Sequence, residues 1–84
     1  MNRPKKTQIY KRYKNAGGSS KVLRYMVEQD SITIEFADNS AYRWTNQSAD
    51  PASIAKMKTL ALSGKGLDAF IESTVKDRFL RKVR

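Results

Sequence analysis

The 84-residue sequence contains no cysteine and no histidine. Without thiols or imidazoles, the chain has no means to form disulfides, thiolate nucleophiles, imidazole general bases or the usual structural zinc sites. Apolar runs never exceed four residues and mean hydropathy is −0.68, far from the roughly 20 apolar residues of a membrane helix. These absences favour a binding module over an enzyme, and predict a cytoplasmic protein with no cofactor, no metal and no membrane partner.

Positive charge is abundant and unevenly distributed. The chain holds 17 Lys and Arg against 8 Asp and Glu, a formal net charge of +9. Residues 1–24 contain eight cations and no acid, residues 25–75 contain four cations and seven acids, and residues 76–84 contain five cations and one acid. A slightly acidic body therefore carries two basic ends, a pattern typical of proteins that contact nucleic acid or another polyanion.

The first basic segment has few aliphatic residues and ends in Gly17-Gly18-Ser19-Ser20. Glycine and serine in this density are typical of linkers. Because so little apolar surface is available to offset the loss of chain entropy, we predict that residues 1–17 form a mobile basic arm. Residues 18–84 are predicted to form a single α+β domain.

Alternation with period two predicts three strands that form an antiparallel meander. Leu23, Tyr25 and Val27 share one face of the first strand, and the second strand spans residues 31–36. The third strand spans residues 41–45 and carries Tyr42 and Trp44 on one face. Arg24, Thr33 and Arg43 are expected on the opposite, open face, where Arg43 pairs with Glu35.

Two registers are open for the turn between the second and third strands. A two-residue loop would place Tyr42 and Trp44 away from the core, as a platform for stacking bases. A turn with Asn39 in the left-handed conformation would pair Ile34 with Tyr42 and bury both rings. We favour the second register because the first would bury the charge of Arg43.

Two helices are expected to follow and to pack on one face of the meander. Asp50 and Pro51 are an N-cap and a first helical residue, and Ser63-Gly64 ends this helix near Leu62. The second helix begins near Leu67 and its apolar row continues past Val75 through Phe79 to Val83. That continuation predicts a C-terminal helix whose end, with Phe79, Leu80 and Val83, docks on a protein partner.

Several of these segments, taken in order, resemble the KTSC domain, a family found at the C-terminal end of some lysyl-tRNA synthetases and as stand-alone bacterial or phage proteins. The resemblance covers residues 18–79, and it departs from the family at Trp44, where a second tyrosine is usual. It implies an α+β fold and RNA binding. The matching segments are Gly18-Ser19-Ser20, the strand around Tyr25, residues 31–36, Tyr42-Arg43-Trp44, and Ser63-Gly64-Lys65-Gly66 with Phe70-Ile71.

The expected function is electrostatic binding of RNA or another single-stranded nucleic acid without catalysis. The alternative is a protein-interaction or regulatory module whose partner is another protein or a second copy of the chain. The residues expected to contact nucleic acid are Lys5, Lys6, Tyr10, Lys11, Arg12, Tyr13, Lys14, Arg24, Arg43, Arg81, Lys82 and Arg84.

Overall fold

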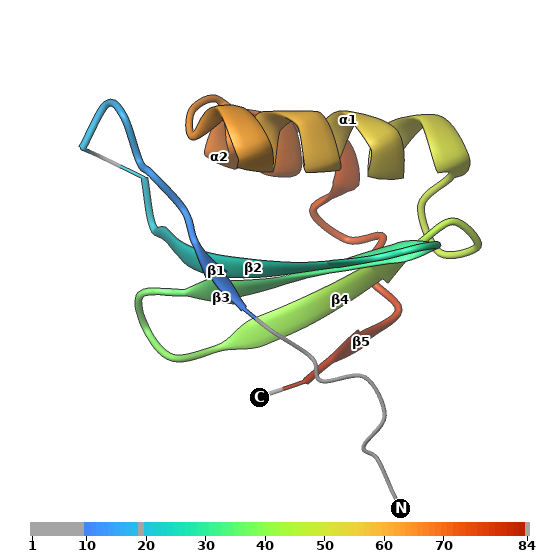
Figure 1. Ribbon diagram of the computed structural model, residues 1–84. Coiled ribbons are helices and arrows are strands. Elements are labelled where there is room, and N and C mark those ends of the chain that lie inside the picture. The colour runs from blue at the N-terminus through green and yellow to red at the C-terminus, as the bar shows by residue number, and fades with distance from the viewer. Residues whose placement is uncertain (1–9, 19, 84) are drawn as a thin grey trace, which may run out of the picture.

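The structure is a computed structural model that describes residues 10–18 and 20–83. Within this part of the chain it is an α+β fold, in which five antiparallel strands lie in the order β1-β2-β3-β4-β5 and the helices cover one side of the sheet (Figure 1). The elements are β1 (Lys11–Arg12), β2 (Val22–Glu28), β3 (Ser31–Phe36), β4 (Ala41–Thr45), α1 (Pro51–Ser63), α2 (Leu67–Phe70), a π-helical turn η1 (Ile71–Val75) and β5 (Arg81–Lys82).

The three central strands are those of the predicted meander, in the register that buries the aromatic residues. Asn39 has a φ of 74°, the Phe36 amide donates to the Ser40 carbonyl at 2.8 Å, and Ile34 lies opposite Tyr42. Trp44 is consequently 2% exposed in the core. The left-handed asparagine adds the one residue that turns both rings toward the helices.

The predicted alternation on β2 is right for Tyr25 and wrong for Val27. The register with β3 shifts between Val22 and Arg24, so that Val22 takes a buried position and Leu23 is only half-buried. Val27 is exposed, because the pairing of β2 with β1 reaches only as far as Tyr25 and leaves Val27 beyond the edge strand.

Within the predicted mobile arm, Tyr13 and the Ala16 amide contact the domain. The Tyr13 amide donates to the Leu23 carbonyl at 3.0 Å, and the Tyr13 hydroxyl accepts from the Leu67 amide at 3.3 Å. Tyr13 is 4% exposed. Burial of its ring and the short backbone pairing compensate for part of the chain entropy that is lost when this segment is ordered. Residues 1–9 lie outside the described residues.

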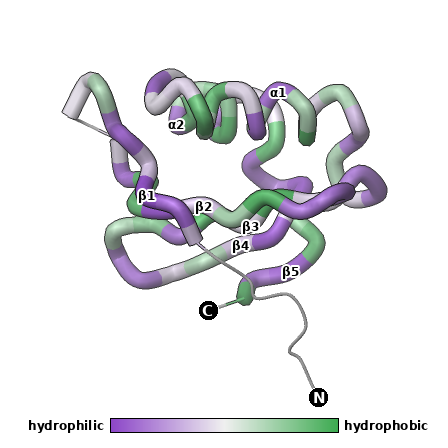
Figure 2. Tube along the Cα trace, viewed as in Figure 1, coloured by the Kyte–Doolittle hydropathy of each residue, from purple (hydrophilic) through white to green (hydrophobic). Residues whose placement is uncertain are grey.

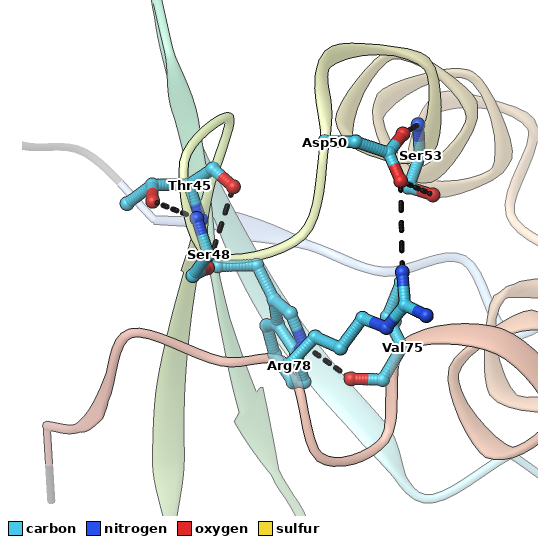
Figure 3. A network of polar contacts seen from close by, with 7 residues as sticks. Thr45, Ser48, Asp50, Ser53, Val75 and Arg78 are labelled. Atoms are coloured by element: carbon cyan, nitrogen blue, oxygen red, sulfur yellow. Dashed lines mark hydrogen bonds and ion pairs between the residues drawn. The ribbon is translucent and has the colours of Figure 1, made fainter.

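Helix α1 begins and ends as its sequence predicts. The Asp50 carboxylate accepts from the Ser53 amide at 2.7 Å, Pro51 occupies the first turn, and Gly64 closes the helix with a φ of 82°. The hydrogen bond from the Ser53 amide lowers the pKa of Asp50, so the cap stays charged at neutral pH. Arg78 Nη1 lies 3.8 Å from the same carboxylate (Figure 3).

The predicted long C-terminal helix is wrong beyond Val75. The helical segment ends with the π-helical turn η1. The Trp44 indole donates to the Val75 carbonyl at 2.8 Å, so this carbonyl at the helix end has a hydrogen-bond partner. The chain then turns back, and Leu80 N donates to the Arg43 carbonyl at 2.6 Å as β5 joins the edge of β4. Among the helices of the described residues, none is long and apolar enough to cross a membrane.

Candidate nucleic-acid interface

The register of the sheet places four arginines on one face. Arg12 on β1 lies opposite Arg24 on β2, and Arg43 on β4 lies opposite Arg81 on β5. Cross-strand partners share a face, and neighbours along a strand point to opposite faces. Since Tyr13, Tyr25 and Trp44 point into the core beneath the helices, these four side chains occupy the other side. We call this side of the sheet the arginine face.

Each basic end of the sequence contributes one short edge strand to the sheet, β1 on one side and β5 on the other. Figure 2 shows hydrophilic residues along β1 and β5, which flank the three central strands. Residues that lie about 70 positions apart in the chain, Arg12 and Arg81, thus reach the same surface. Both side chains are exposed.

Two of the four arginines pair with acids on the same face. Arg24 Nε lies 3.2 Å from Glu35 Oε1, and Arg43 Nη1 lies 2.9 Å from Glu28 Oε1. The predicted pairing of Arg43 with Glu35 is therefore wrong, because Glu35 lies opposite Arg24 and Arg43 lies opposite Thr33. The side chains of Arg24 and Arg43 remain 52% and 28% exposed, so both keep donors available to solvent.

The edge arginines have no acid of their own in the described part of the chain. No ion pair there involves Arg12 or Arg81, and each sits directly opposite another arginine. Like charges in directly opposed cross-strand positions destabilise a sheet. The face therefore combines two unneutralised guanidinium groups with two partly neutralised ones.

The other predicted contact residues lie elsewhere. Tyr13 is buried in the core, on the side of the sheet opposite the arginine face. Lys14 packs beside Gly64 between α1 and α2. Lys11 and Lys82 lie opposite the inward-facing Tyr25 and Tyr42, on the helix side of the sheet.

Tyr10 is half-buried and immediately precedes β1. Lys5, Lys6 and Arg84 lie outside the described residues.

The stacking platform is not formed in this structure. Trp44 is buried, and Tyr42 is half-buried with its ring centroid 4.7 Å from that of Phe79. Both point to the helix side, away from the arginine face, because each alternates with Arg43 along β4.

The predicted docking residues of the C-terminal helix are not helical. Phe79 packs against the core, whereas Leu80 and Val83 are 54% and 47% exposed before and after β5. Since β5 pairs with β4, these residues do not form one apolar stripe.

The sequence predicts that Arg24 and Arg43 share one face with Glu35. It does not predict the pairing of Arg43 with Glu28, or the place of Arg12 and Arg81 on the same face. The alternation of Arg12 with Tyr13 is the one local signal that could have indicated a strand. In the described ranges, no group of three or more Asp or Glu side chains could hold a metal ion.

Comparison with protein-family models, with curated proteins and with solved structures finds no match to this chain. The resemblance to the KTSC domain stays a prediction.

Proposed function

We propose that the protein binds single-stranded nucleic acid, with RNA favoured, through contacts between phosphates and the arginine face. The observation that carries this proposal is the convergence of Arg12 and Arg81, one from each edge strand, with Arg24 and Arg43 on one side of the sheet. Planar guanidinium groups donate two parallel hydrogen bonds to phosphate oxygens. The resemblance to the KTSC domain, for which RNA binding has been suggested, favours the same ligand.

The opposed arginine pairs support an anionic ligand. Arg12 and Arg24, like Arg43 and Arg81, raise the free energy of the folded chain by mutual repulsion. A phosphate between the members of a pair would convert that repulsion into two attractions. The opposed arginines therefore destabilise the free protein and stabilise its complex with an anionic ligand.

The shape of the face favours an extended strand over a duplex groove. Five strands about 4.8 Å apart place the two edges roughly 19 Å from each other, a width that several phosphates of one strand can cross. No helix of the described residues projects from this side to enter a major groove (Figure 1). Because Tyr42 and Trp44 point the other way, binding is expected to be mostly electrostatic, with little sequence preference.

Salt dependence tests this proposal. Four phosphate contacts on a single strand give a slope of about −2.8 for log K against log salt, or a loss of affinity of about fifty-fold between about 50 and 200 mM salt. We expect this slope in fluorescence anisotropy of a labelled oligouridine of about 12 nucleotides. Absence of binding at the lower salt concentration, or a slope near zero, would contradict the proposal.

A further inference from the structure

The helix side of the sheet carries a second surface, a groove that the nucleic-acid proposal does not use. It encloses about 1140 Å³ and runs between the α2–η1 segment and the adjoining ends of β3 and β4. Its apolar lining includes Phe36, Tyr42, Trp44, Ile71 and Phe79. The rings contact each other edge-to-face or tilted, with the Phe36 and Tyr42 centroids 6.1 Å apart and the Trp44 and Phe79 centroids 6.2 Å apart.

The rim of this groove is acidic, although the protein as a whole is strongly basic. Four of the eight acidic residues of the chain line the groove, against two lysines. Lys76 Nζ lies 3.6 Å from Glu72, and the backbone amide of Lys21 donates to Asp68 at 2.9 Å. In the part of the chain that the structure describes, the Asp77 side chain has neither an ion pair nor a hydrogen bond. The four acids are Asp38, Asp68, Glu72 and Asp77.

Hydrogen bonds hold one acid of this rim in its charged form. Hydrogen bonds from the Ser40 hydroxyl and amide lower the pKa of Asp38, and Glu72 and Asp77 are exposed. An anionic ligand would be repelled here, whereas a cationic ligand would be attracted.

One ring of the groove already lies near a cation. Lys82 Nζ is 5.9 Å from the centroid of the Tyr42 ring, within the range of cation–π attraction. The wall opposite contains the π-helical turn η1, with Ile71 and Glu72 in the lining. Such turns occur frequently at functional sites.

We infer that this groove binds a basic peptide segment of a partner protein, one in which lysine or arginine alternates with an aromatic or large aliphatic side chain. The apolar side chains would bury against Phe36, Tyr42 and Phe79, and the cations would pair with Glu72 and Asp77. The groove exceeds the usual size of a small-ligand pocket, and several peptide side chains fit it better. Since the arginine face lies on the other side of the sheet, both ligands can bind together.

Peptide selectivity provides the first test. The single tryptophan of the chain, Trp44, lines the groove and reports binding through its fluorescence. The probe is a synthetic peptide of alternating Lys and Leu, about ten residues long, compared with a Glu-Leu peptide and a Lys-Ser peptide. We expect the Lys-Leu peptide to bind at least about tenfold more tightly than either control. Equal binding of the Glu-Leu or the Lys-Ser peptide, or no binding of the Lys-Leu peptide, would overturn the inference.

A matched pair of charge reversals locates the site. Asp77→Lys changes the groove, and Asp30→Lys makes the same change of net charge at an exposed turn residue outside it. Asp77→Lys should weaken Lys-Leu binding by about tenfold, because it replaces an attraction by a repulsion, and Asp30→Lys by less than about twofold. Equal effects of both variants, with unchanged far-UV circular dichroism, would show that the peptide responds only to net charge.

A second pair tests the apolar lining. Phe79→Ala removes a ring from the groove, and Leu62→Ala removes an exposed apolar side chain from α1. Only Phe79→Ala should reduce Lys-Leu binding if the variant retains its far-UV spectrum. A loss of similar size in Leu62→Ala would contradict the assignment.

Discussion

The double variant Arg12→Glu/Arg81→Glu is expected to bind single-stranded RNA about a hundred-fold more weakly than the wild type at about 100 mM salt. Each reversal removes one exposed attraction and adds one repulsion, together about 1.4 kcal/mol, and 2.8 kcal/mol is a hundred-fold in affinity. The new glutamates would also pair with Arg24 and Arg43 across the sheet and take them away from the phosphates. Fluorescence anisotropy of a labelled oligonucleotide measures the change.

The same variant is expected to be at least as stable as the wild type. Each glutamate replaces a like-charge cross-strand pair by an opposite-charge pair, which stabilises a sheet by a few tenths of a kcal/mol. The midpoint of urea unfolding should therefore rise slightly while RNA affinity falls. A fall in both quantities would mean that the edge arginines serve the fold and not a ligand.

A control of equal charge separates position from net charge. Lys56→Glu/Lys65→Glu makes the same total change at two exposed lysines at α1 and the α1–α2 connection, away from the arginine face. This variant should lower RNA affinity by no more than about fivefold, because only the long-range effect of the protein's net charge changes. If both double variants lose affinity equally, net charge alone explains binding and the arginine face has no special role.

Trp44→Ala is expected to lower the free energy of unfolding of the domain by a large fraction of its total. The Trp44 side chain is 2% exposed and donates a hydrogen bond to the Val75 carbonyl. Its removal should lower the free energy of unfolding by about 3–5 kcal/mol. A chain of 84 residues has a total stability on the order of 4–13 kcal/mol. The comparison variant Trp44→Phe keeps a ring, loses the hydrogen bond and should cost roughly 1–2 kcal/mol.

Urea unfolding followed by far-UV circular dichroism measures both Trp44 variants without a tryptophan signal. A wild-type midpoint for Trp44→Ala would show that the indole is dispensable to the core, and would revive the stacking platform. The urea midpoint is expected to be highest for the wild type, lower for Trp44→Phe and lowest for Trp44→Ala.

The parts of the fold that the sequence predicts correctly rest on local chemistry. Asp50 and Pro51 begin α1 and Gly64 ends it, because cap residues act within a few positions of the helix ends. Asn39 sets the register of β3 and β4 because a left-handed residue adds one position to the turn. From that register follow the burial of Trp44 and the place of Arg43 on the opposite face of β4.

The parts that the sequence does not predict depend on distant contacts. Strands β1 and β5 have two residues each, too few for an alternating pattern. The segment of β1 is fixed by Tyr13, whose hydrogen bond to Leu67 spans 54 positions. The π-helical turn breaks the four-residue spacing on which the prediction of a long C-terminal helix relied.

The candidate site also contains a part that the sequence predicts and a part that depends on distant contacts. Arg24 and Arg43 could be placed on one face from the parity of central strands, whereas Arg12 and Arg81 join them only through the edges. The distribution of charge along the sequence shows two basic ends, but it does not indicate that arginines from both ends lie on one face. Because Arg12 and Arg81 lie on the same face, the positive charge of the two ends is concentrated on one proposed binding surface.

An NMR titration of the isotope-labelled protein with single-stranded RNA at about 50 mM salt shows whether the arginine face contacts the nucleic acid. We expect the largest chemical-shift changes on the side-chain Nε–Hε groups of the arginine face, with smaller changes on the amides of β1 and β5. These groups belong to Arg12, Arg24, Arg43 and Arg81. Changes confined to the helix side of the sheet, or no change at saturating RNA, would contradict this expectation.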